Sequence, residues 1–186
     1  MKRFHLLALP LCMILFAGCI QVKLPNFRIR ETKSYELPPQ SSEAFPIPVE
    51  ILPFQSDSPT KFKMVYRNGN ALRENEFGKW AQTPPMMLTR FFREAFPNAS
   101  GKNLLILKGK ILTFEADEGN KKVNLNVSYS ISKEGKSEIL SSFVLRNSMP
   151  MKNLSAEEYA EVMRQALIAQ VNEVKRRIQE KFSPKK

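Results

Sequence analysis

Residues 121–131, KKVNLNVSYSI, alternate apolar and polar side chains along their length. A period of two places every second side chain on the same face of a strand. One face would carry Val123, Leu125, Val127, Tyr129 and Ile131, and the other Lys122, Asn124, Asn126, Ser128 and Ser130. The stretch therefore predicts a long strand with one buried face, and the neighbouring segments can be placed relative to it.

The links on either side of this strand are short and contain glycine, at residues 118–120 and 133–136. Links of this kind join antiparallel neighbours, so we expect strands at 103–115 and 137–146 and a three-stranded meander. The apolar pattern of the first of these strands changes phase around Gly109. A change of phase predicts a bulge or a strand buried on both faces.

The first half of the chain predicts three further strands. Residues 45–54 place apolar side chains among prolines, which is typical of an edge strand. Residues 61–67 and 71–75 flank Asn68-Gly69, a strong signal for a two-residue hairpin turn.

Two helices complete the pattern. Thr83 followed by Pro84-Pro85 predicts a capped helix start, and the helix would end before Pro97. Ser155 with Glu158 three residues later forms a capping box for a last helix that extends to Phe182. The order β-β-β-α-β-β-β-α predicts an α+β two-layer sandwich, an antiparallel sheet with two helices packed on one face.

The N-terminus has the form of an export signal. Lys2 and Arg3 precede an apolar stretch from residue 4 to 17, which is too short to span a bilayer, and the stretch ends in Leu15-Phe16-Ala17-Gly18-Cys19. This sequence resembles bacterial lipoprotein signals, in which a peptidase cuts before a cysteine that carries acyl chains. An ordinary secretory signal and an uncleaved anchor are the alternatives.

The lipoprotein interpretation divides the chain into a signal peptide at 1–18, a lipidated N-terminus and tether at 19–44, and a folded domain at 45–183. Two or more acyl chains on Cys19 would hold the protein persistently on a membrane. Lipoproteins kept at the inner membrane usually carry Asp after the cysteine, so Ile20 favours the outer membrane, facing the periplasm. Fully extended, the tether of about 25 residues would reach about 80 Å.

Composition limits the chemistry. The chain has 186 residues, two cysteines and one histidine. Cys12 and His5 lie in the predicted signal, so the mature domain would lack imidazole and a free thiol. This argues against a histidine triad, a cysteine nucleophile and a common zinc site, and we expect neither an enzyme nor a metal or cofactor. The acidic cluster of Glu115, Asp117 and Glu118 lies at a predicted hairpin tip, where ordinary surface charge explains it better than metal binding.

The formal net charge is +11, and +9 without Lys2 and Arg3. An exported chain with scattered basic residues is not expected to bind nucleic acid. Lipid head groups, an acidic partner and simple solubility remain open as reasons for this charge.

Several short motifs carry a family resemblance. They are Tyr66-Arg67, Leu72 and the segment Lys79-Trp80-Ala81-Gln82-Thr83-Pro84-Pro85 ahead of the first helix, with Tyr35-Glu36-Leu37 as an early strand. Together they resemble the ABC-type transport auxiliary lipoprotein component family, which includes the paraquat-inducible protein C lipoproteins. The resemblance covers about residues 33–182, and Lys79 stands where that family often has Arg.

This resemblance implies a non-enzymatic envelope lipoprotein that docks a lipid transport system at the outer membrane. Its partners would be an MCE-domain protein and the inner-membrane transporter of that system. Tyr66, Arg67 and Trp80 become candidate partner contacts, although a Trp before a helix is more often a core residue and Arg67 could pair with a nearby carboxylate. The family also suggests assembly in several copies, whereas the strand at 123–131 suits a monomer equally well.

Two other classes of function stay open. The first is an outer-membrane lipoprotein cofactor of another machine, a cell-wall synthase activator or a lipopolysaccharide-assembly factor. The second is an envelope hydrolase. The hydrolase is disfavoured because Ser128, Ser130, Ser141 and Ser142 fall in regular strands rather than on a nucleophile turn.

Overall fold

The computed structural model describes residues 31–39, 45–57, 62–101 and 103–183, which all belong to one compact unit. Cys19 and the predicted signal lie outside the described residues. In chain order the elements are β1 (Lys33–Tyr35), β2 (Val49–Ile51), β3 (Gln55–Ser56), β4 (Lys63–Asn68), β5 (Ala71–Trp80), α1 (Pro84–Ala95), β6 (Leu105–Asp117), β7 (Lys122–Lys133), β8 (Ile139–Pro150) and α2 (Ala156–Phe182). The fold is α+β, with eight strands in one sheet.

The prediction of an antiparallel sheet was wrong, because the sheet is mixed. The strand order is β1-β5-β4-β6-β7-β8, and β2 and β3 also pair with β6. Pairs β4–β5, β6–β7 and β7–β8 are antiparallel, as expected for strands joined by short turns. The pairs that β6 forms with β2, β3 and β4 are parallel, and so is β1–β5. Long connections permit parallel pairing, and α1 lies in the connection between β4–β5 and β6.

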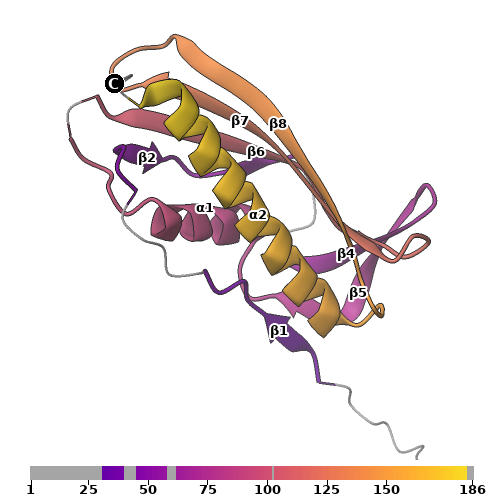
Figure 1. Ribbon diagram of the computed structural model, residues 1–186. Coiled ribbons are helices and arrows are strands. Elements are labelled where there is room, and N and C mark those ends of the chain that lie inside the picture. The colour runs from indigo at the N-terminus through magenta and orange to yellow at the C-terminus, as the bar shows by residue number, and fades with distance from the viewer. Residues whose placement is uncertain (1–30, 40–44, 58–61, 102, 184–186) are drawn as a thin grey trace, which may run out of the picture. The chain divides into compact units, whose positions relative to one another are not determined.

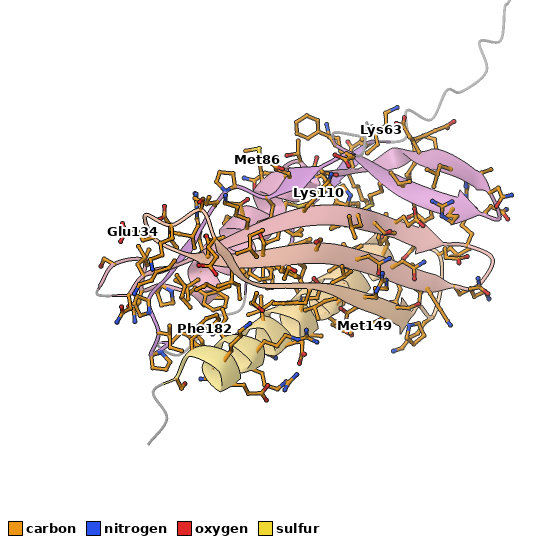
Figure 2. All side chains as sticks on the ribbon, turned by 90° about the horizontal axis from the view of Figure 1, so that it is seen from above. Lys63, Met86, Lys110, Glu134, Met149 and Phe182 are labelled. Carbon is orange, nitrogen blue, oxygen red and sulfur yellow. The ribbon has the colours of Figure 1, made fainter. Side chains whose placement is uncertain are left out.

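Strand β7 confirms the predicted buried face. Val123, Leu125 and Val127 are fully buried, and Tyr129 and Ile131 nearly so. The Tyr129 ring lies 5.7 Å from Phe92 of α1, and its hydroxyl donates a 2.5 Å hydrogen bond to Gln170 of α2. Both helices therefore cover the same face of the sheet, as Figure 1 shows and as Figure 2 shows for α2.

The helix starts differ in part from the predicted caps. The Ser155 hydroxyl accepts a hydrogen bond from the backbone N–H of Glu158, but the Glu158 carboxylate accepts from the backbone of Lys152 instead of completing the box. At α1 the Thr83 side chain makes no capping hydrogen bond, and Pro84 and Pro85 occupy the first turn. Proline lacks the N–H that a cap would satisfy, so the cap is less needed there.

Strand β6 contains both a bulge and a close contact. Its pairing with β7 shifts between Ile111 and Thr113, so the irregularity lies at Leu112, three positions beyond Gly109, around which a bulge or a strand buried on both faces was predicted. At Gly109 an added Cβ would lie 2.2 Å from the Phe54 ring. Glycine is therefore needed at 109, because the Phe54 ring lies directly against the strand backbone.

The packed unit begins before residue 45. Strand β1 pairs with β5, and Leu37 is fully buried in the main core. The segment 31–37 thus belongs to the fold, and the tether predicted for 19–44 shortens accordingly. Among the described helices, none combines the length and apolarity needed to cross a bilayer.

Candidate functional site

Trp80, a candidate partner contact, is a core residue at the end of β5. Its side chain is 1% exposed, and its ring packs edge-on against Phe114 and Tyr159 at 5.3 Å each. The period of two along the strand explains this position. Gly78 and Trp80 lie on the buried side of β5, and Lys79 between them is exposed. The indole supports the junction between β5, β6 and α2, and it is not available at the surface.

Tyr66 on β4 is also buried, at 2% exposure. Its ring lies 5.4 Å from Tyr159 and 5.7 Å from the guanidinium carbon of Arg73. Burial raises the pKa of the Tyr66 hydroxyl. Tyr66 borders a hollow of about 400 Å³, which Phe77 of β5 and Leu154 before α2 also line.

Arg67 forms a bidentate ion pair with Glu115 of β6. Its Nε lies 2.5 Å from one carboxylate oxygen, and its Nη2 lies 3.0 Å from the other. Glu115 is mostly buried, and its hydrogen bonds raise the pKa of Arg67. This contact confirms the pairing with a carboxylate that was the alternative for Arg67. It fastens β4 to β6 beside their short parallel pairing.

The acidic cluster is divided among three different interactions. Glu115 pairs with Arg67, Glu118 pairs with Arg73, and the Asp117 carboxylate accepts hydrogen bonds from the Asn120 backbone and side chain. The bonds from Asn120 lower the pKa of Asp117. Within the described ranges no group of three or more metal-binding side chains is assembled.

A cluster that sequence reasoning missed joins β1 to α2. The Tyr35 hydroxyl donates a 2.7 Å hydrogen bond to the Glu157 carboxylate, and Lys33 Nζ lies 3.2 Å from the same oxygen. Burial and this bond raise the pKa of Tyr35 to about 12, and the bond from Tyr35 lowers the pKa of Glu157 to about 2. Glu157 lies in the first turn of α2, where a carboxylate also suits the helix dipole.

These contacts gather at one end of the described unit. Strand β1, the end of β5 and the start of α2 lie together there, while the C-terminal end of α2 lies at the other end (Figure 1). The chain therefore enters the fold beside the hollow that Tyr66, Phe77 and Leu154 line. Of the candidate site residues, only Arg67 presents a partly exposed side chain, and Cys19 lies outside the described residues.

Comparison with known proteins supports the fold alone. No family model matches the chain, and no curated protein matches it. A crystal structure of a Xanthomonas campestris protein described as DUF330 aligns with a TM-score of 0.64 and 16% identity, over 76% of this chain and 92% of that chain. Another, described only as an uncharacterized protein, aligns with a TM-score of 0.66 and 14% identity, over 80% of this chain and 99% of that chain. The described α+β unit is thus similar in fold to these two solved structures.

Proposed function

We propose that this protein is an outer-membrane lipoprotein that acts as a non-catalytic docking component of an MCE-type, ABC-linked lipid transport system. The observation that carries the membrane attachment is the motif Leu15-Phe16-Ala17-Gly18-Cys19 behind a basic and apolar start, and the transport role rests on the family resemblance around Tyr66-Arg67 and residues 79–85. Acyl chains on Cys19 would supply the membrane attachment, and the domain would supply contact with an MCE-domain protein and its inner-membrane transporter.

The reach of the domain from the membrane follows from where its fold begins. Residues 20–32 separate Cys19 from β1, and they reach about 45 Å at most when fully extended. This is about half of the reach expected from a tether ending at residue 44. A domain held this close has a high effective concentration for any partner near the membrane, so a weak contact suffices for docking.

The face of the sheet that the helices leave uncovered offers a surface for such a contact. It lies opposite both helices and carries alternate side chains of β6, β7 and β8, among them Lys108, Ser130 and Arg146. Arg146 is exposed at the middle of β8 and pairs in register with Asn126. Cations and hydroxyls on one face suit a polar, acidic partner surface.

The test is photo-crosslinking in intact envelopes. A photoreactive residue replaces Arg146 on the uncovered face, and the matched control replaces Glu161 on the exposed side of α2. We expect crosslinks to an MCE-domain protein or its permease from position 146 and few from position 161, with partners identified by mass spectrometry.

Recovery of a cell-wall synthase or a lipopolysaccharide-assembly complex at position 146 would overturn the transport function. It would favour the other class of lipoprotein cofactor. Crosslinks of equal yield from both positions would show that the uncovered face is not the docking surface.

A further inference from the structure

The bulge in β5 exposes the aromatic side chain of Phe77 close to β1, the first strand of the described unit. Between Lys63 and Val65 of β4 the partner residue moves from Lys79 to Glu74, so β5 carries extra residues at this point. The Asn75 side chain accepts hydrogen bonds from the backbone N–H groups of Phe77 and Gly78, at 2.8 and 2.7 Å. These bonds satisfy backbone groups displaced by the bulge, which makes it a stable feature of the strand.

Two large apolar side chains are exposed at this bulge. Phe77 is 42% exposed, and Leu154 in the loop before α2 is 39% exposed. Both line the hollow of about 400 Å³ that Tyr66 borders. Lys33 and Lys152 are exposed at the same end, one bonded to Glu157 and the other with its backbone bonded to Glu158. We call Phe77, Leu154, Lys33 and Lys152 the anchor-end patch.

The length of chain before β1 favours a membrane as the partner of this patch. Residues 20–32 cannot hold Lys33 more than about 45 Å from the lipid-bearing Cys19, whatever conformation they adopt. The opposite end of the domain lies a further helix away, because α2 has 27 residues and is about 40 Å long. Turning that far end to the bilayer would require residues 20–32 to be almost fully extended.

The composition of the patch also suits a lipid surface. An aromatic and an aliphatic side chain can enter the boundary between head groups and acyl chains, while lysines remain among the phosphates. At this end Glu157 is bonded to Tyr35 and Lys33, Glu74 to Lys63 and Glu118 to Arg73. Glu76, which lines the same hollow and is exposed, is balanced by the positive charge of the exposed Lys152. The patch therefore offers apolar contact without a strong net charge, and attachment through it would depend little on salt.

We infer that the anchor-end patch is the surface that the domain turns to the phospholipid head groups of its own anchoring membrane, with Phe77 and Leu154 in contact with lipid. The inference rests on the lipid anchor of the proposed function. It assigns the membrane-facing end of the domain, and it leaves the sheet face around Arg146 directed toward a protein partner.

The test labels single positions of the mature, lipidated protein in vesicles of phosphatidylethanolamine and phosphatidylglycerol. Cys12 and Cys19 are the only cysteines, so a cysteine introduced at Phe77, Leu154 or the control position Ile139 can carry an environment-sensitive fluorophore. Ile139 is 61% exposed and lies near the C-terminal end of α2, where Lys181 bonds to Leu140. Protein without an introduced cysteine reports any labelling of Cys19 that escaped acylation.

We expect quenching by lipids spin-labelled near the head group to be at least about twofold stronger at Phe77 and Leu154 than at Ile139. Flotation of the vesicles reports the anchor separately. Protein that floats but shows equal quenching at all three positions would overturn the patch and leave the anchor intact.

Protein that fails to float would overturn the lipid anchor and, with it, this inference. A fluorophore at Phe77 that responds in whole envelopes but not in protein-free vesicles would assign the patch to a protein partner instead, and would also overturn the inference. Thermal melting of each labelled variant, compared with the parent protein, confirms that these exposed substitutions leave the fold intact.

Discussion

Tyr35 of β1 donates a hydrogen bond to Glu157 of α2 across 122 positions of sequence. This contact joins the first strand of the described unit to the first turn of its last helix, and Lys33 strengthens it from the same strand. Together with the pairing of β1 with β5, it places the start of the described unit at this end of the domain, the end nearest to Cys19 along the chain.

The Tyr35–Glu157 contact predicts a pH dependence of stability. The pKa of Glu157 is lowered to about 2 in the folded protein. The contact therefore stabilises the fold at pH values above the pKa of an ordinary carboxyl group. That contribution is lost as the pH falls from about 5 to about 2. Because Glu157 is more than half exposed, we expect Glu157→Gln to cost at most about 1 kcal/mol at pH 7.

Urea unfolding at pH 7 and pH 3 measures this effect. The difference between the parent and Glu157→Gln should shrink at pH 3, and Glu134→Gln in the exposed turn after β7 serves as the control. A cost that is the same at both pH values would contradict the contact.

Trp80→Ala is expected to destabilise the protein by about 3–5 kcal/mol, because it removes a large ring from contact with Phe114 and Tyr159. Trp80→Phe should cost less, since it retains part of the packing. The measurement is denaturant unfolding followed by circular dichroism. A Trp80→Ala variant with normal stability but lost partner recovery would show that Trp80 is a binding residue rather than a core residue.

The contributions of Arg67 and Glu115 to stability are expected to be coupled, because each side chain is the hydrogen-bonding partner of the other. Glu115→Ala should lower the free energy of unfolding by about 1–3 kcal/mol, because it removes the carboxylate that accepts hydrogen bonds from both Nε and Nη2 of Arg67. Replacing both residues by apolar ones, as in Arg67→Met with Glu115→Leu, should cost less than Glu115→Ala alone. A double-mutant cycle in urea measures the coupling, and additive costs would contradict it.

Gly109→Ala is expected to cost about 1–3 kcal/mol, because the new methyl group would meet the Phe54 ring. Adding Phe54→Leu should recover part of this loss, which a double-mutant cycle detects as coupling. The control is Gly119→Ala, where the nearest atom to an added Cβ is 3.5 Å away. Equal costs at both glycines would show that the Phe54 contact does not restrict residue 109.

Cys19→Ala should release the protein from envelope membranes without unfolding it, since the acyl chains are the expected attachment. Cell fractionation measures the release. Cys12→Ala is the matched control, because Cys12 lies in the segment expected to be removed. Retention of Cys19→Ala on membranes would contradict the lipoprotein interpretation.

Local patterns predicted much of the fold. The alternation at 123–131 identified the buried face of β7, and Asn68-Gly69 marked the turn between β4 and β5 to within one residue, since Asn68 ends β4 and the turn residues are Gly69 and Asn70. Ser155 marked the start of α2. These features depend on side chains a few positions apart, and such spacing is visible in a single sequence.

Pairing between distant segments could not be predicted in the same way. The parallel pairs of β6 with β2, β3 and β4 depend on how connections cross the sheet, and the strands β1, β2 and β3 are too short to show a period. The candidate residues Tyr66 and Trp80 were ambiguous because aromatic side chains suit both cores and interfaces. Their packing against Tyr159 in the tertiary structure shows that both are core residues.

The sequence by itself determined the α+β class, the meander at its centre, the last helix and the motif at Cys19. Each depends on residue types at short spacing, where backbone geometry fixes which side chains share a face. The tertiary structure alone decided the mixed sheet, the early start of the fold at β1 and the position of Phe77 and Leu154 beside it. These depend on contacts between segments far apart in the chain, which form only when the whole core is packed.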